Sequence, residues 1–133
     1  MSKSIKIQDI SKSYPGVKAN SNVSFDIDNA SIHAIVGENG AGKSTLMKIL
    51  YGMVKPDFGE IYVFDEKISL SSPKDAINYG LGMVHQHFML ADNFTVLESI
   101  ILGIDGAGIT NLKLEKYRES INCLLYTSDA ADD

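Results

Sequence analysis

The chain has 133 residues, of which 44% are hydrophobic and 22% charged, the balance of one ordinary globular domain. Its net charge of −5 argues against electrostatic binding to nucleic acid or to an acidic membrane. There is no apolar run of the ~18–20 residues that a membrane span needs, and no secretory segment at the start, so we expect a cytoplasmic protein. The single cysteine, Cys123, excludes an intramolecular disulfide.

The first third of the chain predicts β-structure. Spaced isoleucines in residues 5–10 predict a short strand, and Tyr-Pro-Gly at 14–16 predicts a turn. Hydrophobic and polar residues alternate over 23–27, which is typical of a half-buried antiparallel strand. Residues 32–36 are almost continuously apolar, which predicts a strand buried on both faces. His33 lies in that segment, and we expect it to be a packed core residue.

Helices and strands alternate in the middle of the chain. A glycine-rich turn is followed by one apolar helix face, which ends at Gly52 and the turn at 56–59. Residues 61–64 predict the next strand. Ser72 before Pro73 predicts an N-cap and the first residue of a second helix. The face of the first helix consists of residues at i, i+3, i+4 and i+7, namely Leu46, Ile49, Leu50 and Met53.

The last third continues the same alternation. Residues 81–85 predict a strand, and a final helix is predicted over 112–121. Thr95 and Glu98 have the spacing of a capping box, so a helix is expected to begin between them. Strands that alternate with helices indicate an α/β architecture.

Residues 37–44 match the phosphate-binding pattern G-x-x-x-x-G-K-[ST], between a predicted buried strand and a predicted helix. Glycine lets several backbone amides approach phosphate oxygens closely. Lys43 can reach the β- and γ-phosphates, Ser44 can ligate Mg²⁺, and the helix N-terminus adds partial positive charge. The pattern therefore predicts a nucleoside triphosphate site, and the alternative is a glycine-rich turn with a surface lysine.

Segment 35–46 resembles the Walker A segment of ABC-transporter ATPases, and 55–61 resembles the P-x-x-G-x-I stretch that follows in that family. The resemblance covers almost the whole chain up to residue 122. It implies a P-loop NTPase fold of the α/β class: an ABC ATPase core with an antiparallel β subdomain, truncated before the signature and Walker B motifs. It implies ATP contacts at Tyr14, Gly37, Glu38, Asn39, Gly40, Ala41, Gly42, Lys43, Ser44, Thr45 and Gln86, and Mg²⁺ contacts at Ser44 and Gln86.

Two of these positions lie outside the phosphate loop. Tyr14 stands where the family places an aromatic residue that stacks on adenine; the alternative is a turn tyrosine packed on the first hairpin. Gln86 resembles the Q-loop glutamine, whose amide oxygen can reach Mg²⁺ or the attacking water; otherwise it is a polar residue at a strand end. His85 and His87 flank it, but no third ligand follows, so the pair does not predict a metal site.

Residues 85–90, 94–98 and 14–20 resemble importers of nucleosides and simple sugars. That resemblance implies an ATP-binding subunit on the inner face of the cell membrane, partnered by membrane permease subunits, a second ATPase domain and, indirectly, a substrate-binding protein. The apolar stretch 88–96 would receive a permease helix, with simple core packing as the alternative. Ala30-Ser31 stands where the family often has Gly-Glu, which predicts a slightly strained turn.

Several parts needed for hydrolysis are absent from the sequence. There is no LSGGQ-like motif, and residues 124–129 do not make a Walker B segment because no glutamate follows their acid. Phosphoryl transfer depends on all these groups together. We therefore assign no catalytic residue and expect binding without turnover.

Residues 123–133 break the helical pattern and resemble one reading frame of the transposase adapter used in sequencing libraries. We interpret 1–122 as a partial ABC ATP-binding domain and 123–133 as a non-native tail, with a natural acidic terminus as the alternative. Two other functions stay open: a truncated chain that binds nothing stably, or a P-loop NTPase of another class. A kinase or GTPase would be favoured by a base-recognition motif such as N-K-x-D, which does not occur.

Overall fold

The computed structural model describes residues 3–85, 93–101, 117–123 and 126. The chain divides into two compact units, Met1–Val84 and His85–Asp133. The first unit contains a sheet and two helices. The described part of the second contains α3 (Val96–Ile101) and a helical segment at 117–123.

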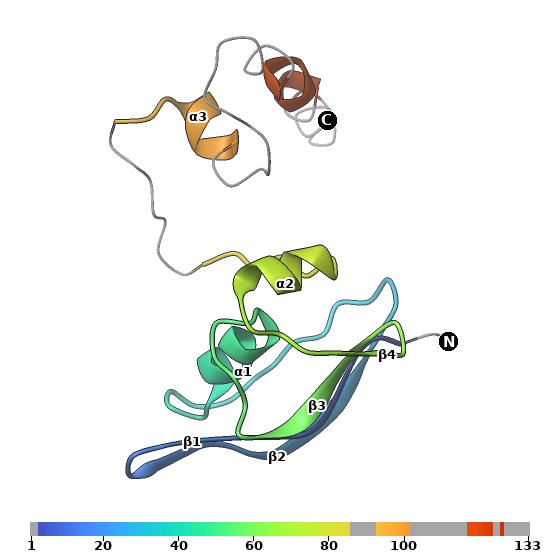
Figure 1. Ribbon diagram of the computed structural model, residues 1–133, viewed down its shortest axis with the longest axis vertical. Helices are drawn as coiled ribbons and strands as arrows, with labels where there is room; N and C mark the ends of the chain where they lie inside the picture. Colours follow the sequence, from blue (N-terminus) through green and yellow to red (C-terminus); the bar gives the residue numbers. More distant parts are fainter. Residues whose placement is uncertain (1–2, 86–92, 102–116, 124–125, 127–133) are drawn as a thin grey trace. The chain divides into compact units, whose positions relative to one another are not determined.

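A four-stranded antiparallel sheet forms the base of the first unit (Figure 1). Its strands are β1 (Lys3–Tyr14), β2 (Val17–Asp28), β3 (Phe58–Val63) and β4 (Glu66–Ile68), in the spatial order β2-β1-β3-β4. β1 and β2 are each 12 residues long and joined by a turn at 15–16, within the turn predicted at 14–16, so the hairpin is longer than the apolar pattern alone indicates. The predicted alternation over 23–27 is confirmed: the hydrophobic residues are half-buried and the polar residues between them exposed.

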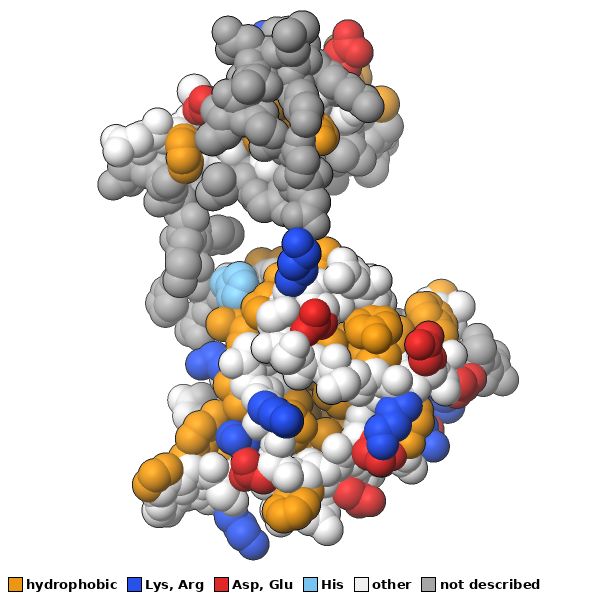
Figure 2. All heavy atoms as spheres, in the orientation of Figure 1, with side chains coloured by type: hydrophobic (Ala, Val, Ile, Leu, Met, Phe, Trp, Pro, Cys, Tyr) orange, Lys and Arg blue, Asp and Glu red, His pale blue; other side chains and the backbone are white. Residues whose placement is uncertain are grey.

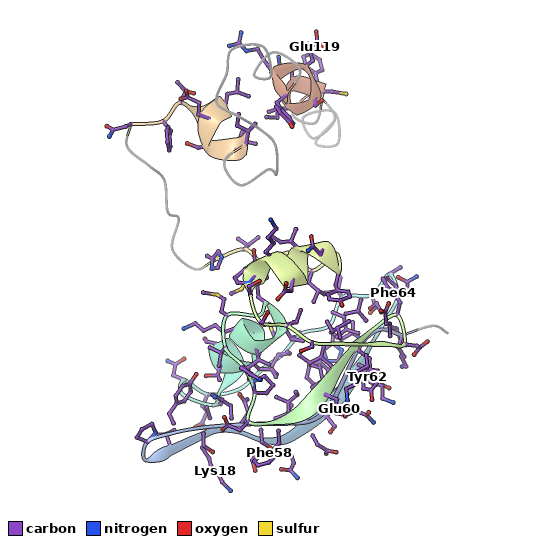
Figure 3. All side chains as sticks on the ribbon, viewed as in Figure 1. Lys18, Phe58, Glu60, Tyr62, Phe64 and Glu119 are labelled. Atoms are coloured by element: carbon purple, nitrogen blue, oxygen red, sulfur yellow. The ribbon has the colours of Figure 1, made fainter. Side chains whose placement is uncertain are left out.

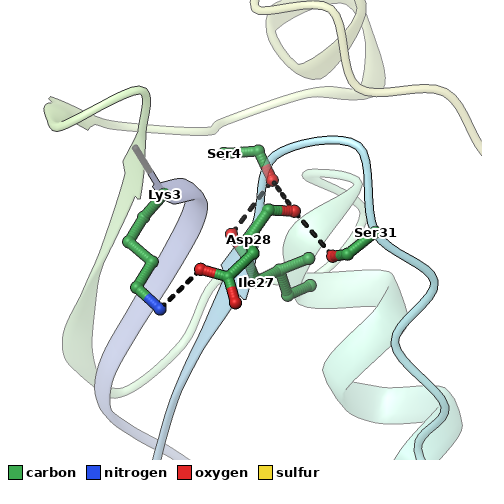
Figure 4. Close-up of polar contacts among 5 residues, drawn as sticks. All are labelled: Lys3, Ser4, Ile27, Asp28 and Ser31. Atoms are coloured by element: carbon green, nitrogen blue, oxygen red, sulfur yellow. Dashed lines mark hydrogen bonds and ion pairs between the residues drawn. The ribbon is translucent and has the colours of Figure 1, made fainter. Parts of the chain in front are cut away.

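The open end of this hairpin is tied by polar contacts between β1 and β2 (Figure 4). The Lys3 ammonium lies 2.7 Å from an Asp28 carboxylate oxygen. The Ser4 hydroxyl donates to the carbonyls of Ile27 and Asp28 at 3.1 and 3.3 Å. Ser31 donates to the Asp28 carbonyl at 2.6 Å, which fixes the chain as it leaves the sheet.

The hydrophobic core lies between the sheet and α1 (Lys43–Leu50). Leu46 and Ile49 are buried, as the helical spacing predicts, whereas Met53 lies beyond the helix end and is 47% exposed. On β3, Glu60 and Tyr62 lie on the side away from α1 (Figure 3). The buried core residues are Ile7, Ile10, Leu46, Ile49, Ile61, Val63, Ile68, Leu70 and Ala76.

Two helices begin at the predicted capping residues. In α2 (Pro73–Asn78) Ser72 is the N-cap and forms a reciprocal capping box with Asp75, with Pro73 in the first position. Before α3, the Thr95 amide donates to the Glu98 carboxylate at 2.8 Å and the Glu98 amide donates to the Thr95 hydroxyl at 3.3 Å. The final helix is confirmed over 117–121, the part of its predicted range that is described.

The predicted strands at 32–36 and 81–85 are wrong for this structure, because neither segment is paired in the described sheet. A strand buried on both faces needs neighbouring strands, and no described strand runs beside either segment. Instead both line an apolar hollow of about 370 Å³. Ile32 and Val36 are almost fully exposed. Figure 2 shows that other hydrophobic side chains are also exposed on the surface, between charged ones.

His33 is also not the packed core residue that we expect from the sequence. Its side chain is exposed, and its ring stacks on Phe25 with centroids 5.2 Å apart and planes 11° apart. The ring therefore covers one side of a half-buried phenylalanine of β2 and is not enclosed in a sheet.

Candidate phosphate-binding site

Two glycines of the loop adopt left-handed backbone conformations immediately before α1. The Ala41 amide donates to the Glu38 carbonyl at 3.2 Å, and Gly40, third in that turn, has φ +86°. Turns with positive φ at the third position favour glycine, which adopts that conformation without strain. Gly42 follows with φ +84° as the N-cap of α1. No side chain caps α1, so the amides of its first turn are available to an anion.

The side chain of Lys43 lies back along this loop. Its ammonium donates to the Gly37 carbonyl at 2.5 Å and to the Glu38 carbonyl at 2.6 Å. Charged donors form the stronger class of protein hydrogen bonds, so these contacts hold the positive charge at the loop. A bound phosphate would compete with two neutral carbonyls for the same ammonium. The predicted role of Lys43 fits this placement.

The end of the loop is packed tightly on β2. A Cβ atom at Gly42 would lie 1.9 Å from the Ala19 carbonyl oxygen, so only a glycine fits there. The Asn20 side-chain amide donates to the Gly42 carbonyl at 3.3 Å. Asn20 is 7% exposed, and among the described residues its Oδ1 has no hydrogen-bond partner. The start of α1 and the first hairpin are therefore held together at this point.

Tyr14, the predicted adenine-stacking residue, is the last residue of β1. Its side chain is 43% exposed, so a ring face is accessible to a ligand. The Lys12 ammonium lies 5.8 Å from the centroid of the Tyr14 ring. In the sheet register Lys12 pairs with Asn20, whose amide contacts Gly42. One hairpin thus carries Tyr14 at its turn and supports the phosphate loop on β2.

The predicted magnesium ligands are only partly described. Ser44 is exposed in the first turn of α1, two residues after Gly42 of the phosphate loop. Gln86 and His87 lie outside the described residues, and His85 is exposed. No group of three or more His, Cys, Asp or Glu side chains in the described part of the chain could hold a metal. Mg²⁺ commonly takes one or two protein oxygens and completes its shell with phosphates and water, so Ser44 fits that role.

Sequence reasoning did not identify Asn20, Lys12 or Asp57 as parts of this site. Asn20 contacts a residue 22 positions away, and Lys12 contacts Asp57 across 45 positions. Polar residues such as Asn20 are common on a strand with one exposed face, so the residue type does not single it out. Asn20 stands at a polar position of the alternating β2 pattern, so the sequence carries no signal that its side chain is buried.

The profile of the ABC transporter family matches residues 20–132. This chain belongs to that ABC transporter family. The guanosine import ATP-binding protein NupO of Bacillus subtilis is 54% identical over 99 residues, 74% of this chain and 19% of the relative. The glucose import ATP-binding protein TsgD13 of Haloferax volcanii is 50% identical over 99 residues, 74% of this chain and 18% of the relative. The ABC transporter chain described here thus spans about a fifth of these relatives' length.

A solved structure gives the same assignment. The nucleotide-free ATP-binding cassette of an ABC transporter is 29% identical and superposes with a TM-score of 0.71, covering 88% of this chain and 46% of that one. The predicted fold class, a P-loop ABC ATPase core with an antiparallel β subdomain, is confirmed. Across the described residues of this ABC family member, no helix is long and apolar enough to cross a membrane.

Proposed function

We propose that this chain binds Mg²⁺-ATP as the nucleotide-binding part of an ABC importer. The observation that carries the proposal is the phosphate loop itself. Gly40 and Gly42 turn the backbone through left-handed conformations, α1 begins without a side-chain cap, and the Lys43 ammonium is held at the loop. Backbone amides and a fixed cation are the groups that a polyphosphate needs.

Each residue has a separate role in this proposal. Residues 37–45 hold the phosphates, and Lys43 neutralises their charge. Ser44 binds Mg²⁺, with Gln86 as a second contact. Tyr14 stacks on the base, an interaction that tolerates different bases. The domain limits are part of the same proposal, with residues 1–122 as a partial ATP-binding domain and 123–133 as a non-native tail.

The transported substrate in this proposal is a nucleoside or a simple sugar. Its support is the pair of relatives whose names specify guanosine import and glucose import. The chain would act on the inner face of the cell membrane with permease subunits, a second ATPase domain and a substrate-binding protein. The second unit is consistent with a contact surface, because Phe94 and Val96 are exposed there, at 38% and 77%.

The test is Mg²⁺-ATP binding by the purified chain and by a Lys43→Ala variant, measured by titration calorimetry. We expect the variant to bind at least 10-fold more weakly, because it loses a charge-assisted contact to phosphate, worth about 1.5–3 kcal/mol. Lys48→Ala is the matched control, since Lys48 is an exposed lysine in the last turn of the same helix. Equal affinity of parent and Lys43→Ala contradicts the proposed role of the loop.

Thermal protection gives an independent measurement. A ligand that binds only the folded state adds about 2.7 kcal/mol at 100 times its Kd. We expect ATP to raise the melting temperature of Lys43→Ala less than that of the parent, because a 10-fold weaker ligand adds about 1.4 kcal/mol at the same concentration. A parent chain that shows neither heat of binding nor protection is the truncated, non-binding chain of the alternative interpretation.

A further inference from the structure

Asp57 ties the strand end that carries Tyr14 to the segment that follows α1. One carboxylate oxygen lies 2.7 Å from the Lys12 ammonium, and the other accepts from the Ser13 amide at 2.8 Å. The Asp57 amide in turn donates to the Ser11 carbonyl at 2.9 Å. Three consecutive residues before Tyr14 are therefore held by a single aspartate. We call Lys12 and Asp57 the clamp.

The same lysine faces the ring of Tyr14. At 5.8 Å from the ring centroid, the Lys12 ammonium is within the range of about 6 Å for a cation–π contact. The Lys12 side chain is 18% exposed and that of Asp57 36%, so solvent only partly screens the clamp. The Lys12 hydrogen bond, followed by the Ser13 amide, lowers the pKa of Asp57 below its usual value. Asp57 is therefore charged at neutral pH, and one ammonium connects it to the Tyr14 ring.

Regular sheet pairing does not by itself fix this strand end. The register of β1 with β2 shifts between Ile10 and Lys12 and again between Lys12 and Ser13. On the other side, the pairing of β1 with β3 ends at Ser11 and Phe58. The last residues of β1 are therefore paired on one side only, with β2 and in an irregular register, and the clamp adds contacts that hold Lys12 and Ser13 in place.

We propose that Asp57 is a positioning residue that acts through Lys12 to fix the Tyr14 ring for stacking on the base of the bound nucleotide. The inference rests on the proposed nucleotide-binding function. Asp57 does not itself contact the nucleotide. It lies in the segment that follows α1, so the clamp ties the base side of the site to that segment.

The test separates base contacts from phosphate contacts. Affinities for ATP and for inorganic tripolyphosphate are measured by titration calorimetry with Mg²⁺, for the parent, Asp57→Asn and Lys12→Met. We expect both variants to bind ATP at least 5-fold more weakly, the loss that corresponds to about 1 kcal/mol of base–aromatic stacking. We expect their affinity for tripolyphosphate to stay within 2-fold of the parent, about 0.4 kcal/mol. Asparagine keeps an acceptor for the Ser13 amide but presents its NH2 group to the Lys12 ammonium, so the backbone contact is kept and the ion pair is lost.

Asp28→Asn is the matched control. Asp28 forms an ion pair of the same 2.7 Å length with Lys3 at the opposite end of the same hairpin. That variant should keep both affinities. Lys12→Arg should keep ATP binding, because the guanidinium retains the charge over the ring.

A double variant tests the route through the ring. If the clamp acts by placing Tyr14, then Tyr14→Ala should lose most of the base contribution, and adding Asp57→Asn should cost little more. Equal losses for ATP and tripolyphosphate in Asp57→Asn would mean a general structural role and overturn the inference, as would full ATP affinity. Either result leaves the phosphate loop intact as a nucleotide site. A parent that binds neither ligand refutes the proposed function itself.

Discussion

Replacing Gly42 with alanine tests how the phosphate loop is fixed to the hairpin. Gly42 has φ +84°, a conformation that costs a residue with a Cβ about 1–2 kcal/mol. The new Cβ would lie 1.9 Å from the Ala19 carbonyl oxygen and 2.9 Å from the Asn20 amide nitrogen. The carbonyl belongs to the backbone of β2 and cannot rotate away. Overpacking of this kind costs about 1–3 kcal/mol more, so we expect Gly42→Ala to destabilise the chain by about 2–5 kcal/mol.

Gly40→Ala is the matched comparison. Gly40 has almost the same φ, +86°, but a Cβ added there meets nothing within 4 Å. It should cost only the backbone strain, about 1–2 kcal/mol. Gly16→Ala tests the same backbone strain outside the loop, because Gly16 has φ +78° and an added Cβ meets nothing within 4 Å. The assay is urea unfolding followed by circular dichroism, with the free energy extrapolated to water. If Gly42→Ala costs no more than Gly40→Ala, the tight contact with β2 is refuted.

Three further predictions concern backbone strain, acid stability and the buried amide. Ala30 has φ +53°, so Ala30→Gly should stabilise the chain by about 1 kcal/mol in thermal unfolding. Hydrogen bonds from Ser71 and Ser72 lower the pKa of Asp75. The Asp75 carboxylate therefore adds to the free energy of unfolding above pH ~4, and this stabilisation is lost as the pH falls through the folded-state pKa. Between pH 6 and about 2, the melting temperature should decline less in Asp75→Asn than in the parent. Asn20→Asp would place a carboxylate against the Gly42 carbonyl, and at pH 7 we expect urea unfolding to show a loss of about 2–4 kcal/mol that acidification partly restores.

Local signals account for most of what the sequence predicts correctly. The N-cap at Ser72 before Pro73 and the capping box of Thr95 and Glu98 depend on residues at most three positions apart, and both form. The phosphate loop and the buried face of α1 are equally local. The predicted strain near Ala30 is confirmed, because a residue with a Cβ occupies a left-handed conformation there.

Non-local pairing accounts for the failures. Residues 32–36 have the composition of a buried strand, but a strand forms only beside a partner, and no described segment provides one. The sequence does not predict β4, because Glu66–Ile68 is short and mostly polar. The clamp between Lys12 and Asp57 joins residues 45 positions apart. In a single sequence, neither residue differs from an ordinary surface charge.

The chain order of the sheet has a consequence for how this protein is made. β1 and β2 are complete at Asp28, whereas β3, which pairs with the other edge of β1, ends 35 residues later at Val63. Hairpins form in about 1–10 μs, but an isolated two-stranded hairpin is only marginally stable in water. At about 5–20 residues per second, the ribosome needs about 2–7 s to supply those residues. During that interval the β1–β2 hairpin of the nascent chain opens and closes many times, and it becomes stable only when β3 pairs with β1.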